Sequence, residues 1–308
     1  GSAVLTMHEA AHTVDLALAR ELIAASFPEH GDAVLRPVAT IGTVNTIVRV
    51  GKDLVARFPL LPVARAEAEA EAASMTALAV SSPFPAPLPR GVADGSAAFP
   101  SAWSLQTWLP GETAGSTAQA ASVSLAEDLV TLIRGLRATE VEDRVFDGRG
   151  RGGTLTDHDE WVAECLHRSG HLLDTDRATR LWTALRSLPS DGPDVMSHRD
   201  LTPFNLLVRE ADGVTRLVGV LDGGGFGPAD RALDLVSAWH LFDAPARAVL
   251  RDGVGVSDTE WLRGAAWAFQ QAIGLGWYYE QSNPPMSTLG LTTLRRLLDD
   301  QELATLDR

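Results

Sequence analysis

The stretch Ser197-His198-Arg199-Asp200-Leu201-Thr202-Pro203-Phe204-Asn205-Leu206-Leu207-Val208 decides how this sequence is interpreted. Asp200 is followed five positions later by Asn205, which enters an apolar strand. A second apolar segment, residues 217–221, ends in Asp222 and three glycines, seventeen positions after Asn205. The pattern predicts a loop followed by a β-hairpin that ends in an Asp.

These residue types suit phosphoryl transfer from a nucleotide. One carboxylate orients the attacking hydroxyl and accepts its proton, while oxygen ligands hold Mg²⁺ across the phosphates. In that order, Asp200 would be the base, and Asn205 and Asp222 the two ligands. The plainer alternative is that Asp200 caps a turn and Asn205 occupies a bend. That alternative does not account for Asp222, which follows Asn205 at the spacing expected for a second metal ligand at the end of a hairpin.

The charge of the chain argues against polyanionic partners. The 308 residues include 40 Asp and Glu against 26 Lys and Arg, a formal net charge of −14 at pH 7. Since a polyphosphate would be repelled at long range, we expect neither nucleic acid nor an anionic membrane surface as a partner. A cationic small molecule would suit the charge, although many enzymes are acidic merely for solubility.

Cysteine and apolar content bear on the compartment. Cys165 is the only cysteine, which excludes an intrachain disulfide and fits a reducing environment. No apolar run approaches the roughly 18 residues that a membrane span needs. The first seven residues lack the basic region and the apolar stretch of a signal peptide. We therefore expect a cytoplasmic protein.

The expected secondary structure changes character along the chain. Strands are rich in the first third, where β-branched residues alternate and short turns separate them. The expected strands there are residues 39–50, 54–59 and 99–109. Two short strands are also expected after His198. The remaining segments with helical patterns are residues 15–27, 64–78, 118–137, 157–167, 175–188 and much of 231–308.

The motifs around Asp200 and Asp222 resemble the aminoglycoside phosphotransferase group of antibiotic kinases, which has the protein-kinase-like fold. In that group the loop commonly reads His-Gly-Asp-Leu-x-Pro-x-Asn-Leu-Leu-Val, and the metal strand reads Ile-Asp-Phe-Gly. A Gly-Asp-Pro-Ala-x-Asp-Leu segment follows. This chain has the loop at residues 198–208, then Leu221-Asp222-Gly223-Gly224, then residues 227–235.

The resemblance implies an α+β, bilobal fold and a set of site residues. A small β-rich nucleotide-binding lobe would span residues 1–108, and a larger, mainly helical catalytic and acceptor-binding lobe residues 109–308. Asp200 would be the catalytic base, Asn205 and Asp222 would bind Mg²⁺, and ATP or GTP would be the co-substrate.

Other motif residues would support the site or depart from the pattern of the group. His198 would brace the loop, and Asp234 would bond to the loop backbone. Arg199 replaces the usual glycine, Gly223 the usual aromatic residue and Arg231 the usual proline. None of these departures removes a ligand, but losing the aromatic residue is expected to loosen the metal strand.

Kinases of this fold hold the nucleotide phosphates with a cation on a strand, paired with a helix Glu. Lys52 is the only lysine and lies in a turn, so Arg57, within a strand, is the expected cation. Glu71 is its expected partner, with Glu67 and Glu69 as alternatives in the same acidic run.

Two more segments match the nucleotide site of the group. Residues 40–45, with Gly42 and Asn45, occupy the position of the nucleotide loop, although a single glycine is equally typical of a hairpin turn. Residues 103–109, with Ser104 and Gln106, match the segment that joins the lobes, whose backbone would bond the base edge. Because backbone recognition leaves the side chains free, the sequence does not choose between ATP and GTP.

The acceptor is expected over the C-terminal lobe, facing Asp200. Carboxylates there would pair with ammonium groups, and aromatic faces would carry sugar rings or cations. The candidates are Asp157, Asp159, Glu160, Trp239, Trp277, Tyr278 and Glu280. Taken one by one, such aromatics are more often core residues, and such acidic runs are more often solvated helix starts.

The sequence therefore predicts a small-molecule O-phosphotransferase that moves the γ-phosphate of ATP or GTP onto a hydroxyl of an antibiotic. An aminoglycoside is the first candidate, as in a resistance or self-resistance enzyme. A kinase for another hydroxylated acceptor (a macrolide, a nucleoside-type or peptide antibiotic, or a metabolite) is one alternative. A nucleotide-binding pseudokinase or regulatory module is the other, favoured only by Gly223 and Arg199. We expect a monomer or a weak dimer.

Overall fold

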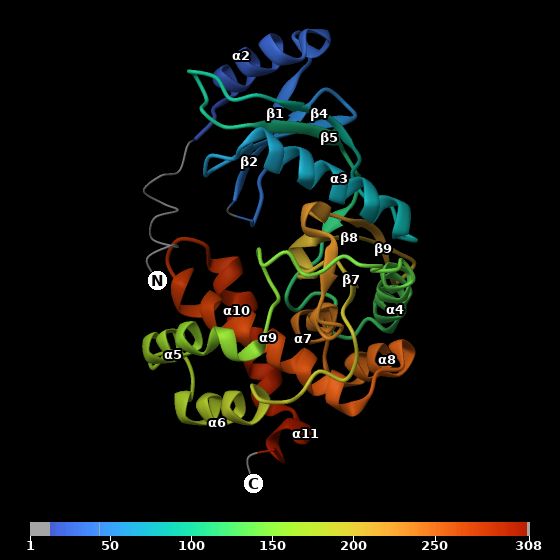
Figure 1. Cartoon of the computed structure of the whole chain (residues 1–308), viewed down its shortest axis with the longest axis vertical. Helices are drawn as coiled ribbons and strands as arrows, with labels where there is room; N and C mark the ends of the chain where they lie inside the picture. The colour runs from blue at the N-terminus through green and yellow to red at the C-terminus, as the bar shows by residue number, and fades with distance from the viewer. Residues whose placement is uncertain (1–12, 43, 307–308) are drawn as a thin grey trace.

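The structure, a computed structural model, describes residues 13–42 and 44–306, so the first seven residues considered above lie outside it. Figure 1 shows a β-sheet region at the N-terminal end stacked on a larger, mainly helical C-terminal region. This is the α+β, bilobal architecture that the sequence predicts. The division at residue 108 stays a prediction.

The N-terminal region is built on a five-stranded antiparallel sheet of order β1-β2-β3-β5-β4. Its strands are β1 (Leu35–Pro37), β2 (Asn45–Val50), β3 (Leu54–Pro59), β4 (Pro89–Ala93) and β5 (Trp103–Thr107). Val48, Phe58 and Trp103 are buried beneath α2 (Leu16–Ser26) in one apolar cluster. Burying each such side chain contributes about 1.5–3 kcal/mol, so this sheet has its own small core.

Two helices flank this sheet as the sequence predicts. The Asp15 carboxylate accepts from Leu18 N–H at 2.7 Å and caps α2. On the other side, α3 (Arg65–Ser81) lies between the sheet and the C-terminal region (Figure 1). There it packs against the turn η4 (Gly223–Gly225).

The predicted strand over residues 39–50 is wrong at its start, because β2 begins at Asn45. The Thr40 hydroxyl donates to the Gly42 carbonyl at 3.1 Å. This local side-chain bond turns the backbone in place of a strand ladder. Residues 38–42 therefore form an irregular loop above the site instead of part of the sheet.

The C-terminal region combines helices with short strands. Its helices are α4 (Val123–Arg137), α5 (Asp159–Arg168), α6 (Thr175–Leu185), α7 (Val236–Leu241), α8 (Ala244–Val254), α9 (Asp258–Tyr278), α10 (Pro284–Asp299) and α11 (Gln301–Ala304). Its strands are β6 (Glu112–Thr113), β7 (Val195–Ser197), β8 (Leu206–Ala211), β9 (Val214–Val220) and β10 (Gly227–Ala229). Further single turns of this region are η2 (Leu155–His158), η3 (Pro203–Asn205) and η5 (Leu233–Leu235), and one more, η1 (Pro28–His30), follows α2 in the N-terminal region.

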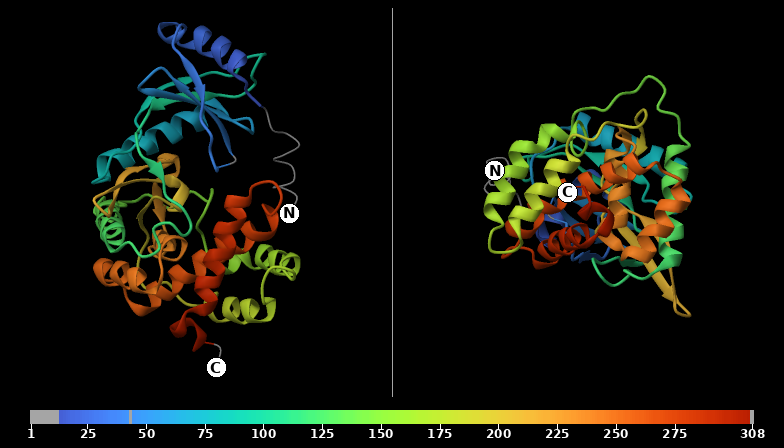
Figure 2. Two further views of the ribbon diagram at one scale, coloured as in Figure 1. Left: turned by 180° about the vertical axis from the view of Figure 1, so that it is seen from behind. Right: turned by 90° about the horizontal axis from the view of Figure 1, so that it is seen from below.

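Helix α9 forms the centre of the larger core. It is mostly apolar all round, and Trp267, Phe269 and Ile273 are fully buried. A helix that is apolar on every face requires neighbours on every face. Figure 2 shows α5 and α6 on one side of the α9–α10 pair, and α4 and α8 on the other. Among the described residues, no helix combines the length and the apolarity of a membrane span.

Candidate active site

His198 joins the loop that carries Asp200 to the strand that precedes Asp222. The Asp200 N–H donates to His198 Nδ1 at 3.1 Å, and His198 Nε2 lies 2.7 Å from the Leu221 carbonyl oxygen. Since Nδ1 accepts, the ring proton is on Nε2 and is donated to Leu221. One buried imidazole thus spans the two motifs, and the bracing contact expected of His198 is confirmed.

Asp234 holds the same loop from the core. Its buried carboxylate accepts from the Ser197 hydroxyl at 2.8 Å and from the backbone N–H groups of Arg199 at 3.3 Å and His198 at 3.4 Å. A buried carboxylate is costly unless several donors satisfy it. The predicted bond between Asp234 and the loop backbone is confirmed.

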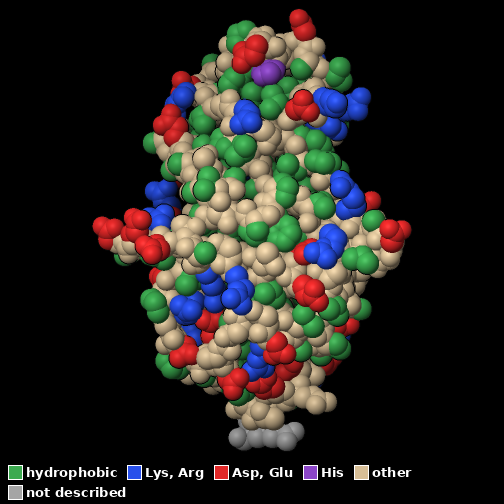
Figure 3. All heavy atoms as spheres, turned by 90° about the vertical axis from the view of Figure 1, so that its right-hand side faces the viewer, with side chains coloured by type: hydrophobic (Ala, Val, Ile, Leu, Met, Phe, Trp, Pro, Cys, Tyr) green, Lys and Arg blue, Asp and Glu red, His purple; other side chains and the backbone are tan. Residues whose placement is uncertain are grey.

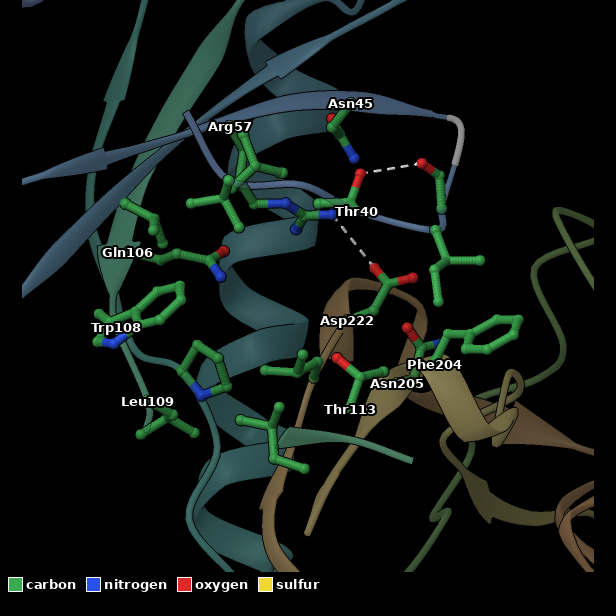
Figure 4. Close-up of a pocket in the computed structure, with 18 of the residues that line it drawn as sticks. Thr40, Asn45, Arg57, Gln106, Trp108, Leu109, Thr113, Phe204, Asn205 and Asp222 are labelled. Carbon is green, nitrogen blue, oxygen red and sulfur yellow. Dashed lines mark hydrogen bonds and ion pairs between the residues drawn. The ribbon is translucent and has the colours of Figure 1, made fainter. Parts of the chain in front are cut away.

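Asn205 connects the two carboxylates of the motif. Its Nδ2 donates to the Asp200 carbonyl at 2.9 Å and to Asp200 Oδ2 at 3.1 Å. The backbone carbonyl oxygen of Asn205 accepts from Leu221 N–H at 2.8 Å. This bond brings the next residue, Asp222, beside Asn205. Figure 4 shows the Asn205 side chain directly below Asp222, at the edge of one cavity.

The side chains of Asn205 and Asp222 fit a magnesium ion by their chemistry. With Nδ2 committed to Asp200, the amide oxygen of Asn205 is the atom left for a ligand. An amide oxygen and a carboxylate are hard oxygen donors, and Mg²⁺ characteristically takes one or two protein ligands plus phosphates and water. Within the described residues, no group of three or more His, Cys, Asp and Glu forms a separate metal cluster.

Arg57 enters this site from the sheet. It lies on β3, and its Nη2 is 3.4 Å from Asp222 Oδ1, the ion pair drawn in Figure 4. The predicted partner, Glu71 on α3, lies in the same electrostatic environment. Burial raises the pKa of Glu71, the charge of Arg57 opposes that rise, and the charge of Asp222 adds to it. Arg57 thus pairs with Asp222 and is near enough to Glu71 for its charge to act on that carboxyl.

The first two of the three glycines after Asp222 let α3 approach the turn. A Cβ at Gly223 would lie 2.7 Å from the Leu78 side chain, and one at Gly224 would lie 3.3 Å from Glu71 Cβ. Asp222 itself has a φ of +60°, in the left-handed region. Leu78 fills the space beside the turn and Gly223 is buried, and the expected loosening of this strand by Gly223 stays a prediction.

A cavity of about 350 Å³ opens beside Arg57 and Asp222, between the sheet and β8. Gly42 and Asn45 line it from the loop and strand above, and Trp108 and Leu109 from the segment after β5. Gln106 lines it from β5 itself and is 8% exposed, and its Oε1 receives no hydrogen bond within the described part of the chain. A buried amide oxygen without a donor is costly, which makes Gln106 suited to a ligand N–H.

Ser104, two residues earlier on β5, does not line this cavity. It pairs in register with Arg57 and lines a smaller recess of about 30 Å³ that also includes Glu71. Ser104 is thus beside the predicted phosphate cation, while Gln106 faces the cavity where a nucleotide would fit.

The far side of Asp200 holds a residue that sequence reasoning missed. Arg151 Nε lies 3.0 Å from Asp200 Oδ1, and it comes from the glycine-rich segment between α4 and α5. The signal in the sequence was Arg199 in place of glycine, since the Arg199 side chain holds this segment through the backbone oxygen of Arg151 at 3.3 Å.

The predicted acceptor carboxylates are largely engaged with neighbouring side chains. Asp159 accepts from Trp182 and Arg186, and the hydrogen bonds from Arg186 lower the pKa of Asp159. Glu280 lies 2.9 Å from His171 Nε2. Of the other two, Asp157 closes a capping box with Thr154, and Glu160 is exposed in the first turn of α5.

The predicted acceptor aromatics divide into two groups. Trp239 is fully buried in the core against Trp261, so its position does not support a role as an acceptor wall. Trp277 and Tyr278, at the end of α9, are partly exposed and pack edge-to-face with ring centroids 5.7 Å apart. The Arg168 guanidinium lies 5.1 Å from the Trp277 ring.

A comparison with known protein families shows which family the chain belongs to. The family model described as the phosphotransferase enzyme family matches residues 36–267, which cover parts of both lobes, Arg57 and the whole Asp200 to Asp222 motif. The chain belongs to the phosphotransferase enzyme family. No curated protein sequence matches it significantly.

Solved structures similar to this phosphotransferase confirm the protein-kinase-like fold. A GDP complex of an aminoglycoside 2'-phosphotransferase has a TM-score of 0.70 and 17% identity, with 95% of this chain and 99% of that chain covered. A GDP and kanamycin complex of an APH(2")-type protein has a TM-score of 0.67 and 17% identity, covering 90% and 97%. A macrolide 2'-phosphotransferase from Brachybacterium faecium has a TM-score of 0.59 and 20% identity, covering 91% and 97%.

Proposed function

We propose that this phosphotransferase moves the γ-phosphate of ATP or GTP onto a hydroxyl of a small-molecule antibiotic, with aminoglycosides as the first candidates. The observation that carries the proposal is the Asn205 amide group, which bonds to Asp200 on one side and lies beside Asp222 on the other. Asn205 and Asp222 line a cavity of about 350 Å³, which supports a pair of Mg²⁺ ligands there with Asp200 beside them as the base.

Asp200 would accept the proton of the acceptor hydroxyl while the hydroxyl oxygen bonds to the γ-phosphorus. The bond from that phosphorus to the β–γ bridging oxygen breaks, and its electron pair leaves on the nucleoside diphosphate. Asn205 and Asp222 would hold Mg²⁺, which when bound neutralises charge on the phosphates. Positioned proton transfer of this kind contributes about 10²–10⁴-fold to rate.

The nucleotide would lie in the cavity beside Arg57. Arg57 would bind phosphate oxygens, with Glu71 keeping its guanidinium oriented. Gly42 and Asn45 would cover the phosphates. The base would lie against the later part of residues 103–109, where Gln106, Trp108 and Leu109 line the cavity and the backbone would bond the base edge. Ser104 would lie on the phosphate side, next to Arg57.

A specific observation favours a second candidate, an acceptor with less positive charge than an aminoglycoside. Arg151 is the side chain that meets Asp200 Oδ1, and two of the predicted acceptor carboxylates are already paired, Asp159 with Arg186 and Glu280 with His171. On the face shown in Figure 3, acidic and basic side chains are intermixed, so the net charge of −14 does not gather there. A macrolide, a nucleoside-type or peptide antibiotic, or a hydroxylated metabolite would fit this environment.

A panel of antibiotics with ATP and with GTP, read by release of nucleoside diphosphate, tests the proposal. Acceptor-dependent release that Asp200→Asn abolishes supports the enzyme, and the acceptor class that gives it decides between the two candidates. Nucleotide binding with no release for any acceptor supports a pseudokinase or regulatory module instead.

We also propose that the enzyme acts in the cytoplasm, where its nucleotide is available, as a monomer or a weak dimer. Sedimentation across protein concentrations checks the oligomeric state.

A further inference from the structure

The segment between α4 and α5 covers one oxygen of the proposed base. Arg151 Nε lies 3.0 Å from Asp200 Oδ1, and that oxygen is buried and receives no hydrogen bond within the described part of the chain. The other oxygen, Oδ2, accepts from Asn205. Asp200 therefore has one oxygen fixed by the motif and one shielded by a cation.

Arg199 fastens this segment to the catalytic loop. Its side chain is 8% exposed and donates to the backbone oxygens of Arg149, of Arg151 at 3.3 Å and of Gly225 at 3.3 Å. It also pairs with Asp147 at 3.1 Å, and its guanidinium lies 4.7 Å from the Phe146 ring. Every one of these contacts except that to Gly225 goes to the segment over residues 146–151.

The backbone of Arg199 shows that this contact has a cost. Its φ is +76°, a region that glycine adopts freely and a side chain does not. The loop could keep this conformation more easily with the glycine that the related motif has. An arginine here is explained by what its side chain holds, which is the segment that delivers Arg151.

The far end of the segment is held as well. The Gly152 carbonyl oxygen lies 3.0 Å from His158 Nε2, and a Cβ on Gly152 would lie 2.8 Å from the Phe146 ring. Contacts to the backbone on both sides of Arg151 hold its guanidinium at Asp200, in addition to the ion pair itself. Such a pair alone would contribute little.

We propose that Arg151 determines the specificity of transfer against water, by covering Asp200 Oδ1 until an acceptor displaces it, and that Arg199 is the positioning residue for this cover. The inference rests on the proposed function, because water would compete with the antibiotic hydroxyl for the same base, Asp200. A guanidinium has donors only, so it relays no proton from water to the carboxylate. A whole acceptor molecule has the binding energy to displace Arg151, and a single water does not.

With the cover removed, water takes the place of the acceptor. A water oxygen bonds to the γ-phosphorus, and Asp200 takes one water proton. The bond from that phosphorus to the β–γ bridging oxygen breaks, and the electron pair leaves on the nucleoside diphosphate. The products are inorganic phosphate and the diphosphate, formed with no acceptor present.

The test measures release of inorganic phosphate from MgATP and MgGTP without any acceptor. Arg151→Gln keeps the length of the side chain and removes the charge, and we expect acceptor-free hydrolysis to rise about fivefold, the effect of losing one partly exposed ion pair. Arg199→Gly keeps the Arg151 side chain but removes the contacts that hold its segment. We expect acceptor-free hydrolysis to rise by a similar factor. Adding Asp200→Asn to either variant returns hydrolysis to background.

Arg144→Gln is the matched control. It makes the same change in the same connecting segment, but Arg144 is exposed, and its hydrogen bonds within the described residues go to the carbonyls of Glu140 and Val141. We expect wild-type hydrolysis from it. Thermal melts of all variants show whether each is folded, and Arg151→Gln, at a partly exposed side chain, serves if Arg199→Gly does not fold.

Hydrolysis by Arg151→Gln at or below the wild-type level overturns the proposal. This failure is distinct from that of the proposed function. Transfer to an antibiotic without increased hydrolysis in Arg151→Gln retains the function and rejects the cover. Asp200-dependent hydrolysis in Arg151→Gln, with no transfer to any antibiotic, retains the cover and rejects the antibiotic acceptor. Absence of both reactions rejects both.

Discussion

The two sides of the site each contain one arginine paired with one aspartate, but the two pairs are built differently. On the nucleotide side, Arg57 is 3.4 Å from Asp222, next to an open cavity of about 350 Å³. On the acceptor side, Arg151 is 3.0 Å from Asp200, whose Oδ1 is buried. The first pair leaves room for a ligand, and the second covers the Asp200 oxygen that a reacting hydroxyl would use under the proposed function.

The difference lies in what holds each arginine. Arg57 belongs to β3, hydrogen-bonded to strands on both sides, so the sheet sets its position whether or not Asp222 is present. Arg151 belongs to a loop that Arg199 and His158 hold by side-chain contacts with backbone oxygens. A strand residue suits a permanent binding group, and a loop residue suits a group that must move.

The largest expected effect comes from breaking the acceptor side at its carboxylate. Asp200→Asn keeps the size of the side chain but removes its ability to accept a proton, so turnover should fall about 10²–10⁴-fold. Nucleotide affinity, measured by calorimetry, should change little because Arg57 and Asp222 are untouched. Turnover close to wild type would show that another group accepts the proton.

Removing the cation of the nucleotide side should have a smaller effect of a different kind. Arg57→Ala loses a charge-assisted contact to phosphate, which should weaken nucleotide binding by roughly 10–100-fold. Arg36→Ala, at an exposed position on β1, removes the same charge from the same sheet and is the control. Equal affinities for the two variants would contradict the assignment of Arg57.

The approach of α3 to the metal strand can be broken at Gly223. A phenylalanine there meets Leu78, so Gly223→Phe should lower the free energy of unfolding by about 1–3 kcal/mol, measured by urea denaturation. Adding Leu78→Ala should recover part of that loss by making room. Gly170→Phe, where a Cβ would meet nothing within 4 Å, should have little effect.

The smallest effect should come from the cavity wall. Gln106→Leu removes an amide oxygen that receives no hydrogen bond from the described residues, so stability should not fall. Nucleotide affinity should drop about fivefold, the typical value of one hydrogen bond. Thermal melts and calorimetry separate these two readouts. Unchanged affinity for both ATP and GTP would mean that Gln106 does not touch the base.

Much of the fold could be predicted because the signals are local. Asp15 caps the start of α2, the turn at Lys52 separates β2 from β3, and the alanine-glutamate run over residues 66–73 lies within α3. The misses have physical reasons. β4 contains a proline and a glycine, which lower strand propensity, and it forms because β5 offers a partner across a loop.

The sequence by itself determined the centre of the site. Asp200 and Asn205 lie in one short loop, and Asp222 ends the hairpin that follows, so chain connectivity alone brings them together. The roles proposed for these residues, a base and two Mg²⁺ ligands, come from the chemistry of their side chains. Activity measurements test those roles.

Only the tertiary structure decided which distant groups meet this centre. Arg151 reaches Asp200 from 49 positions earlier in the chain, and Leu78 fills the space beside Gly223. The same packing buries Trp239, which the sequence placed in the acceptor wall. Such contacts depend on how helices and loops pack, and neither residue type nor spacing encodes that over a long range.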